Sequence, residues 1–266
     1  MKISVLVPTW NPGPALERAL ESVWCQTHTD FEVIVMDAAS TDGTVAFLKR
    51  NSPRIAVWRS EPDAGTTDAL NKGLKFATGE LVTFLCADDY FADHNVFREV
   101  VSAFAKNPKT DWLAASIQVV DSEGLISPHV VKSEPSLMHK RMTVNLPGAF
   151  LRTRLLKERQ FDSRVEIAND YELFSFLLCE RRAELLVLDR VNTVFAAGGR
   201  SNSTWTDFRK ARDCFFVRRK YFGFWAAWPA YGRDILVSVL RKMGFRPLTW
   251  LRLIRRWFSP PPAPNL

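Results

Sequence analysis

Apolar and polar positions along the first 105 residues predict strands and helices in alternation. Four short, nearly continuous apolar stretches are predicted as buried strands: Ile3–Pro8, Phe31–Asp37, Arg54–Glu61 and Glu80–Cys86. Between them, apolar residues recur three and four positions apart, which predicts helices that begin near Pro14, near Thr67 and after Asp93. This alternation is typical of an α/β domain whose mainly parallel sheet is covered by helices on both faces.

Polar residues follow each of the four predicted strands: Thr9–Asn11, Asp37, Glu61–Asp63, and the pair Asp88 and Asp89. The carboxyl ends of parallel strands meet at one edge of the sheet, where folds of this class bind ligands. Two adjacent carboxylates repel each other, and burying either one without a positive partner is costly. We therefore expect a ligand site at this edge, with a positive group beside Asp88 and Asp89.

A nucleoside diphosphate held by a metal ion fits this pattern. Asp37 suits a nucleoside, because a carboxylate accepts hydrogen bonds from ribose hydroxyls or base N–H groups. The dinucleotide motif GxGxxG is absent, since Pro8, Thr9 and Trp10 stand in its place, and there is no Walker loop. Mg²⁺ or Mn²⁺ on Asp88 and Asp89 is the alternative way to hold a diphosphate.

Five stretches, in this order, resemble the inverting family-2 glycosyltransferases of the GT-A fold, of the type that builds bacterial surface polysaccharides. They are VLVPTWN (Val5–Asn11), DAASTDGT (Asp37–Thr44), SEPDAGTTDALNKG (Ser60–Gly73), GELVTFLCADDYF (Gly79–Phe91) and NDYELF (Asn169–Phe174). Each stretch alone is a weak signal, but the ordered set is specific and covers about residues 1–200. The resemblance implies a mainly parallel, Rossmann-like sheet with helices on both faces and a C-terminal helical extension.

The resemblance also implies roles for individual residues. The implied donor-binding residues are Pro8, Thr9, Asp37, Asp68, Asn71, Lys72 and Asp88, with Thr9 and Asp37 on the nucleoside. Asp89 is implied as the direct metal ligand, with Asp88 near the metal or the ribose. Asp170 is implied as the catalytic base. It falls in the first turn of a predicted helix, whose positive N-terminal end we expect to keep it ionised.

The chain departs from the family pattern at two places. Ala87 precedes the acidic pair, so that only two carboxylates are available there. Leu146 and Pro147 stand where relatives often have a His-Gln pair.

The function implied is transfer of a hexose, with inversion, from a UDP-, GDP- or dTDP-sugar to a hydroxyl of a glycan or lipid-linked acceptor. A nucleotidyltransferase is one alternative, but it needs a glycine-rich, lysine-containing loop where PTWNPG follows the first strand. A non-catalytic partner subunit is another, and it predicts loss of Asp88, Asp89 or Asp170, all of which are present.

Several of these residues also have a purely structural interpretation. Asp37 can cap the turn that follows it, and Asp88 and Asp89 can be ordinary turn residues. Asp170 can be an acid at a helix N-terminus, and Lys72 a solvated helix lysine.

The net charge of +7 is concentrated in the last quarter of the chain. From Arg200 onward there are 14 Lys and Arg against 3 Asp and Glu, whereas residues 1–199 have 22 against 26. We expect a catalytic domain over 1–200, with a nucleotide-binding half (1–105) and an acceptor half (106–200), and a basic helical tail over 201–266. The tail either binds an anionic membrane surface or packs on the domain. Its apolar faces are too broad for nucleic-acid binding.

Cellular location is predicted from cysteines and apolar runs. The four cysteines form no CxxC pair, and three lie in apolar surroundings, which favours reduced core thiols. A strand begins directly after Met1 and Lys2, which argues against a signal peptide. The longest apolar run, Phe222–Gly232, is too short to span a bilayer. We expect a cytoplasmic protein, at the inner face of the cytoplasmic membrane if the tail binds lipid.

Overall fold

The computed structural model describes residues 1–120, 126–131, 134–139, 142–196 and 204–242. Its centre is a sheet that begins with four parallel neighbours in the order β3-β2-β1-β4. They are β1 (Ile3–Thr9), β2 (Phe31–Asp37), β3 (Val57–Ser60) and β4 (Leu81–Phe84), the four strands predicted from the sequence. The third strand is shorter than predicted, because residues 52–54 form a 3₁₀ turn, η1.

The sheet continues beyond β4 in the order β8-β6-β9-β5, with β7 paired to β6. The bounds are β5 (Tyr90–Phe91), β6 (Trp112–Val120), β7 (Ile126–Val131), β8 (Ala149–Arg152) and β9 (Leu185–Ala196). Strand β8 runs antiparallel to β4 and β6, whereas β9 is parallel to β6. Strand β5 follows the acidic pair directly and joins the far edge by pairing with β9. The sheet therefore folds the acidic pair against a segment more than 100 residues away in sequence.

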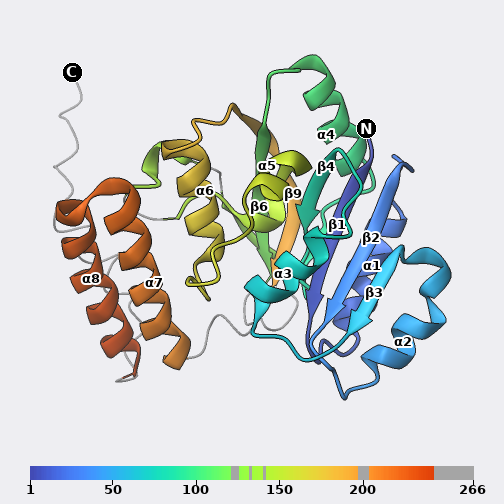
Figure 1. The fold of residues 1–266 in the computed structure, drawn as a ribbon, viewed down its shortest axis with the longest axis horizontal. Helices are drawn as coiled ribbons and strands as arrows, with labels where there is room; N and C mark the ends of the chain where they lie inside the picture. Colours follow the sequence, from blue (N-terminus) through green and yellow to red (C-terminus); the bar gives the residue numbers. More distant parts are fainter. Residues whose placement is uncertain (121–125, 132–133, 140–141, 197–203, 243–266) are drawn as a thin grey trace, which may run out of the picture.

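Helices cover both faces of this sheet, as predicted (Figure 1). One buried cluster contains residues of α1 (Ala15–Trp24), α2 (Thr44–Arg50) and α4 (Val96–Lys106). The other contains residues of α3 (Thr66–Leu74), α5 (Thr153–Glu158) and α6 (Asn169–Cys179). Residues of β1 alternate between the two, with Val5 and Val7 in the first cluster and Leu6 in the second. Two further 3₁₀ turns are η2 (Pro135–Leu137) and η3 (Leu146–Gly148).

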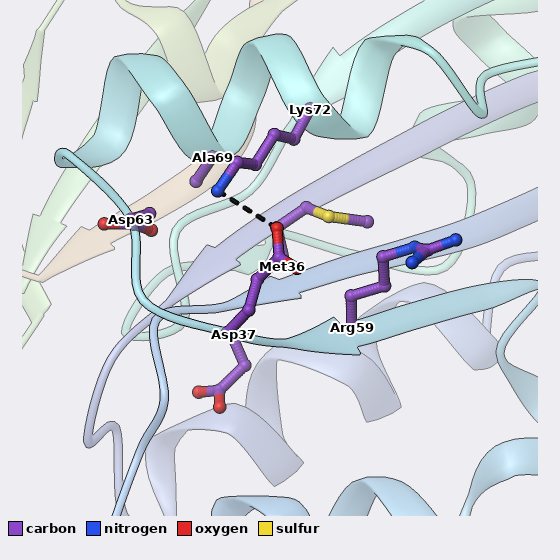
Figure 2. Close-up of a pocket in the computed structure, with 7 residues that line it drawn as sticks. Met36, Asp37, Arg59, Asp63, Ala69 and Lys72 are labelled. Carbon is purple, nitrogen blue, oxygen red and sulfur yellow. Dashed lines mark ion pairs between the residues drawn. The ribbon is translucent and has the colours of Figure 1, made fainter.

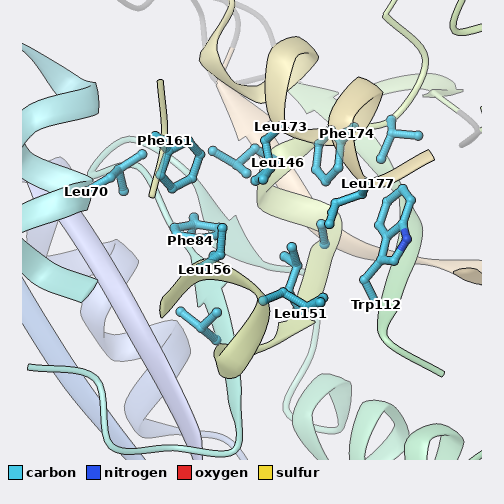
Figure 3. Packing of buried hydrophobic residues seen from close by; sticks show 14 of the residues in the cluster. Leu70, Phe84, Trp112, Leu146, Leu151, Leu156, Phe161, Leu173, Phe174 and Leu177 are labelled. Carbon is cyan, nitrogen blue, oxygen red and sulfur yellow. The ribbon is translucent and has the colours of Figure 1, made fainter. Parts of the chain in front are cut away.

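Two long helices, α7 (Thr204–Phe222) and α8 (Phe224–Lys242), form a hairpin beside α6 (Figure 1). Cys214 and Val217 of α7 belong to the same buried cluster as Trp112 and Phe174, whose rings stack 5.1 Å apart (Figure 3). The hairpin thus packs on the domain through α7. The expected boundary at residue 200 lies within 197–203, outside the described residues, and stays a prediction.

The cysteines differ from expectation. All four are free, but only Cys214 is buried, whereas Cys86 and Cys179 are half-buried and Cys25 is exposed. The expectation of three core thiols is wrong because Cys25 and Cys179 lie at helix ends and Cys86 lies beyond the end of β4. Within the described residues, no helix combines the length and apolar character needed to cross a bilayer.

Candidate active site

The ends of β1, β2 and β3 bring three polar side chains together. Thr9 pairs with Asp37 across the β1–β2 ladder, and Asp37 pairs with Ser60 across the β2–β3 ladder. The hydroxyl oxygen of Thr9 is buried and has no hydrogen-bond partner among the described residues. The predicted assembly of polar groups at the carboxyl edge is therefore present.

The Asp37 carboxylate is buried and already holds the local structure. Its Oδ2 accepts hydrogen bonds from the backbone N–H of Ser40 (3.0 Å) and the hydroxyl of Ser60 (2.6 Å). Its Oδ1 accepts one from the hydroxyl of Ser40. The structural interpretation of Asp37 thus holds for the contacts seen, and a ribose hydroxyl would have to join or replace a serine. Its nucleoside role stays a prediction.

The acidic pair lies in a tight turn after β4. The N–H of Asp89 donates to the carbonyl of Cys86 (3.0 Å), which closes the turn. Asp89 is fully buried, and its Oδ1 accepts the N–H of Ala196 (3.0 Å) at the end of β9. Its Oδ2 has no hydrogen-bond partner among the described residues. Burial, reinforced by the charge of Asp88, raises the pKa of Asp89 to about 8.

A divalent cation fits this turn. A buried carboxylate oxygen without a partner is costly, and a second carboxylate beside it adds repulsion. Ligand atoms of Cys86, Asp88 and Asp89 all lie within 4.8 Å of one another. The sequence prediction included the two carboxylates but missed Cys86, although this residue stands only two positions before Asp88. A bound cation would satisfy Asp89 and remove the repulsion from Asp88.

Asp170 lies in the first turn of α6, as predicted. Its Oδ1 accepts the N–H of Tyr171 (2.7 Å), and burial raises its pKa to about 6. Loss of hydration opposes ionisation, yet a pKa of about 6 leaves the Asp170 carboxylate ionised at neutral pH, as expected. The contribution of the helix N-terminus to this ionisation stays a prediction. Burial raises the pKa of the Cys86 thiol, and the charges of Asp89, Asp88 and Asp170 raise it further. The charge of Asp170 thus acts on the thiol of the turn that carries the acidic pair.

The α3 residues lie beside β2 and β3. Lys72 Nζ forms ion pairs with Glu61 (3.0 Å) and Asp68 (3.1 Å), so it is not simply solvated. Figure 2 shows Lys72 reaching from α3 toward β2, with the Asp37 carboxylate pointing away from it. The pocket between them is about 10 Å³, room for one water and not for a nucleoside. The side-chain amide of Asn71 exchanges hydrogen bonds with the backbone of Phe161 (3.0 and 2.9 Å), and its donor-binding role stays a prediction.

The segment that leads into α6 is anchored by residues that the sequence prediction missed. The side-chain amide of Asn169 donates to the Thr67 hydroxyl of α3 (2.9 Å). The carboxylate of Asp213, almost fully buried on α7, accepts the backbone N–H groups of Glu166 (3.0 Å) and Ile167 (2.9 Å). No local motif marks Asp213, because its partners lie more than 40 residues away. Together these contacts determine where Asp170 lies.

Comparison with known proteins identifies relatives over most of the chain. The family model described as glycosyl transferase family 2 matches residues 4–159. An uncharacterized glycosyltransferase of Mycobacterium tuberculosis is 30% identical over 249 residues, which is 91% of either chain. A PGL/p-HBAD biosynthesis glycosyltransferase of Mycobacterium bovis is 31% identical over 117 residues, covering 43% of this chain and 46% of the relative.

Solved structures share the fold. S. aureus TarS 1–349 in complex with UDP-GlcNAc superposes with a TM-score of 0.64 at 22% identity, over 82% of this chain. The chain spans only 65% of that fragment's length. The mannosyltransferase PcManGT from Pyrobaculum calidifontis, in complex with GDP-Man and Mn²⁺, has a TM-score of 0.64 at 20% identity, over 95% of this chain and 78% of its own. These matches confirm the expected GT-A fold.

We predict that Asp213→Ala loosens the segment before α6. The substitution removes two hydrogen bonds to a charged acceptor, which should lower the free energy of unfolding by about 1.5–3 kcal/mol. Urea unfolding measures this loss, and hydrogen exchange should accelerate at the Glu166 and Ile167 amides. Asp189→Ala, which removes an exposed carboxylate of β9, is the control and should change stability by less than about 0.5 kcal/mol. Unchanged exchange at both amides would contradict the anchoring role.

Proposed function

The chain belongs to glycosyl transferase family 2, and on that basis we propose that it is a metal-dependent, inverting hexosyltransferase. It takes a UDP-, GDP- or dTDP-sugar as donor and a hydroxyl of a glycan or lipid-linked acceptor, in synthesis of cell-surface polysaccharide. The observation that carries this proposal is the buried Oδ2 of Asp89, which has no hydrogen-bond partner among the described residues and lies beside Asp88. The complexes of TarS with UDP-GlcNAc and of PcManGT with GDP-Man and Mn²⁺ support the class of donor and cofactor.

Asp89 and Asp88 are the residues that would hold Mg²⁺ or Mn²⁺. Bound there, the cation supplies neutralisation of the charge that develops on the departing diphosphate. The buried Thr9 hydroxyl, which lacks a partner, and Asp37 are placed side by side by the β1–β2 register. This placement supports a nucleoside site at the ends of these two strands.

Asp170 is proposed as the general base. Its carboxylate takes the proton of the acceptor hydroxyl, and that oxygen attacks the anomeric carbon on the face opposite the diphosphate. The bond from the anomeric carbon to the diphosphate oxygen breaks as the new bond forms, so the configuration inverts. Because burial sets the pKa of Asp170 at about 6, the carboxylate is ionised at neutral pH yet basic enough to accept a proton.

We also propose that the C-terminal hairpin holds the enzyme at the inner face of the cytoplasmic membrane. The first turns of α8 expose aromatic rings, with Trp225 87%, Trp228 57% and Phe224 47% exposed. Leu236 and Val239, farther along α8, are exposed as well. Trp-rich apolar surface on a basic segment suits an anionic membrane surface.

Binding of a nucleoside diphosphate is expected to depend on a divalent cation. UDP and GDP are titrated into the protein by calorimetry, first with Mn²⁺ and then with excess chelator. Asp89→Ala should reproduce the effect of the chelator, whereas Asp37→Ala should weaken binding with or without the metal. Asp189→Ala is the control carboxylate. Equal affinity in Mn²⁺ and in chelator would remove the metal from the proposal.

Asp170→Asn should separate catalysis from donor binding. The variant keeps the shape of the side chain but removes its basicity, so turnover should fall by roughly 10²- to 10⁴-fold while donor affinity barely changes. The wild-type rate should fall as the pH drops below about 6, and this acid limb should be absent in the variant. Asp162→Asn is the control, because Arg164 holds the pKa of Asp162 at about 2, outside that range.

Three results would count against Asp170 as the base. They are near-normal transfer by the Asn variant, a loss explained wholly by donor affinity, and a product with retained anomeric configuration.

The membrane proposal is tested with vesicles. Full-length protein should sediment with anionic vesicles at low salt, and less so at high salt. Truncation after Gly244 removes four arginines and no acid, which should weaken binding by up to about 1 kcal/mol per arginine. Trp225→Ala combined with Trp228→Ala should weaken it further, and the Asp189→Ala control should bind normally. If the full-length protein does not sediment with anionic vesicles at low salt, the hairpin serves only to pack on the domain.

A further inference from the structure

A thiol shares the acidic turn with the two carboxylates. The sulfur of Cys86 and carboxylate oxygens of Asp88 and Asp89 lie within 4.8 Å of one another. The turn itself enforces this grouping, because the Asp89 N–H donates to the Cys86 carbonyl (3.0 Å). Cys86 and Asp88 are half-buried, so the grouping can be reached from solvent.

An independent observation indicates that this grouping binds a cation. Asp89 is fully buried, and its Oδ2 has no hydrogen-bond partner among the described residues. Its other oxygen is held by the Ala196 N–H at the end of β9, so the carboxylate is fixed in place. A carboxylate fixed by one oxygen, with the other oxygen unsatisfied, is prepared for a positive ligand.

Sulfur alters which cations suit the site. Mg²⁺ and Mn²⁺ prefer oxygen ligands, whereas thiolate sulfur favours softer ions. Zinc accepts sulfur and carboxylate oxygen in one coordination sphere, and cadmium belongs to the same soft class. A turn with two carboxylates alone would favour the hard ions, but the presence of Cys86 adds affinity for the soft ones.

We propose that Cys86, Asp88 and Asp89 form a mixed sulfur–oxygen site that binds soft divalent cations of the zinc and cadmium class and thereby excludes the hard cation. The proposal rests on the proposed function in one respect, that both kinds of cation use Asp89. On binding, the Cys86 thiol and the Asp89 carboxyl, where protonated, release their protons to solvent, and the sulfur and the carboxylate oxygen each donate a lone pair to the cation. Soft cations therefore act as inhibitors of donor binding at this site.

Cadmium titration of the full-length protein tests the site through the ultraviolet thiolate-to-metal charge-transfer band, which needs no enzymatic activity. The wild type should show this band at low cation concentration. Cys25→Ser, which removes the exposed cysteine, is the matched control and should keep it. Cys86→Ser should lose it. Asp89→Asn should weaken cadmium affinity by at least the roughly tenfold typical of a lost outer-shell partner.

Several outcomes overturn the proposal: no band in the wild type, a band that survives Cys86→Ser, a band lost in Cys25→Ser, or undiminished affinity in Asp89→Asn. A parallel calorimetric titration of UDP and GDP with Mn²⁺ into the wild type separates this failure from that of the proposed function. If diphosphate binding needs Mn²⁺ but no band forms, only the mixed site is wrong. If the affinity for the diphosphate is also the same with and without Mn²⁺, the metal assignment itself is wrong. If the band forms and diphosphate binding needs Mn²⁺, added Cd²⁺ should abolish the Mn²⁺-dependent binding. Binding that persists in Cd²⁺ would show that the soft cation does not exclude the hard one.

Discussion

The burial of the Asp89 carboxyl group, in the turn after β4, is the main constraint on the carboxyl edge of the sheet. One of its oxygens is held by the Ala196 N–H and the other has no partner among the described residues, so burial of the ionised group is costly and raises its pKa to about 8. Apolar packing around the turn must offset that cost. Phe91, two residues farther on, contacts Phe97 edge to face at 4.9 Å, and Phe97 lies 6.0 Å from Phe150. This aromatic cluster lies directly after the turn that carries the Asp89 carboxylate.

The proposed base, Asp170, comes from a different part of the chain, in the first turn of α6. Polar contacts from both sides position its segment, with Thr67 on α3 and Asp213 on α7 as the nearest anchors. Deeper in the domain, Glu172 is fully buried and paired with Arg159 (2.5 Å) and Lys220 (3.0 Å), which joins α6 to α7. Through α7, the α7–α8 hairpin thus supports α6, the helix that carries Asp170.

Several residues whose proposed role is donor binding also make contacts within the protein that stabilise its structure. Asp37 accepts hydrogen bonds that order the turn after β2, and Lys72 forms ion pairs with Glu61 and Asp68. These contacts hold the side chains in one place before a donor arrives, which lowers the ordering cost of binding. The structural and functional interpretations of these residues are therefore compatible.

The sequence by itself determined the elements whose signals are local. Continuous apolar runs and helical spacing predicted β1, β2, β4, α1, α3 and α4 closely, and the polar residues after each strand predicted that polar groups gather at the carboxyl edge. Periodicity could not show that β5 crosses to pair with β9, nor the strand order of residues 106–200, because those pairings join distant segments. Nor could it show the burial of Asp89, the raised pKa of Asp170 or the anchoring by Asp213. Hydration and hydrogen-bond partners depend on what packs around a group, and only the tertiary structure decides that.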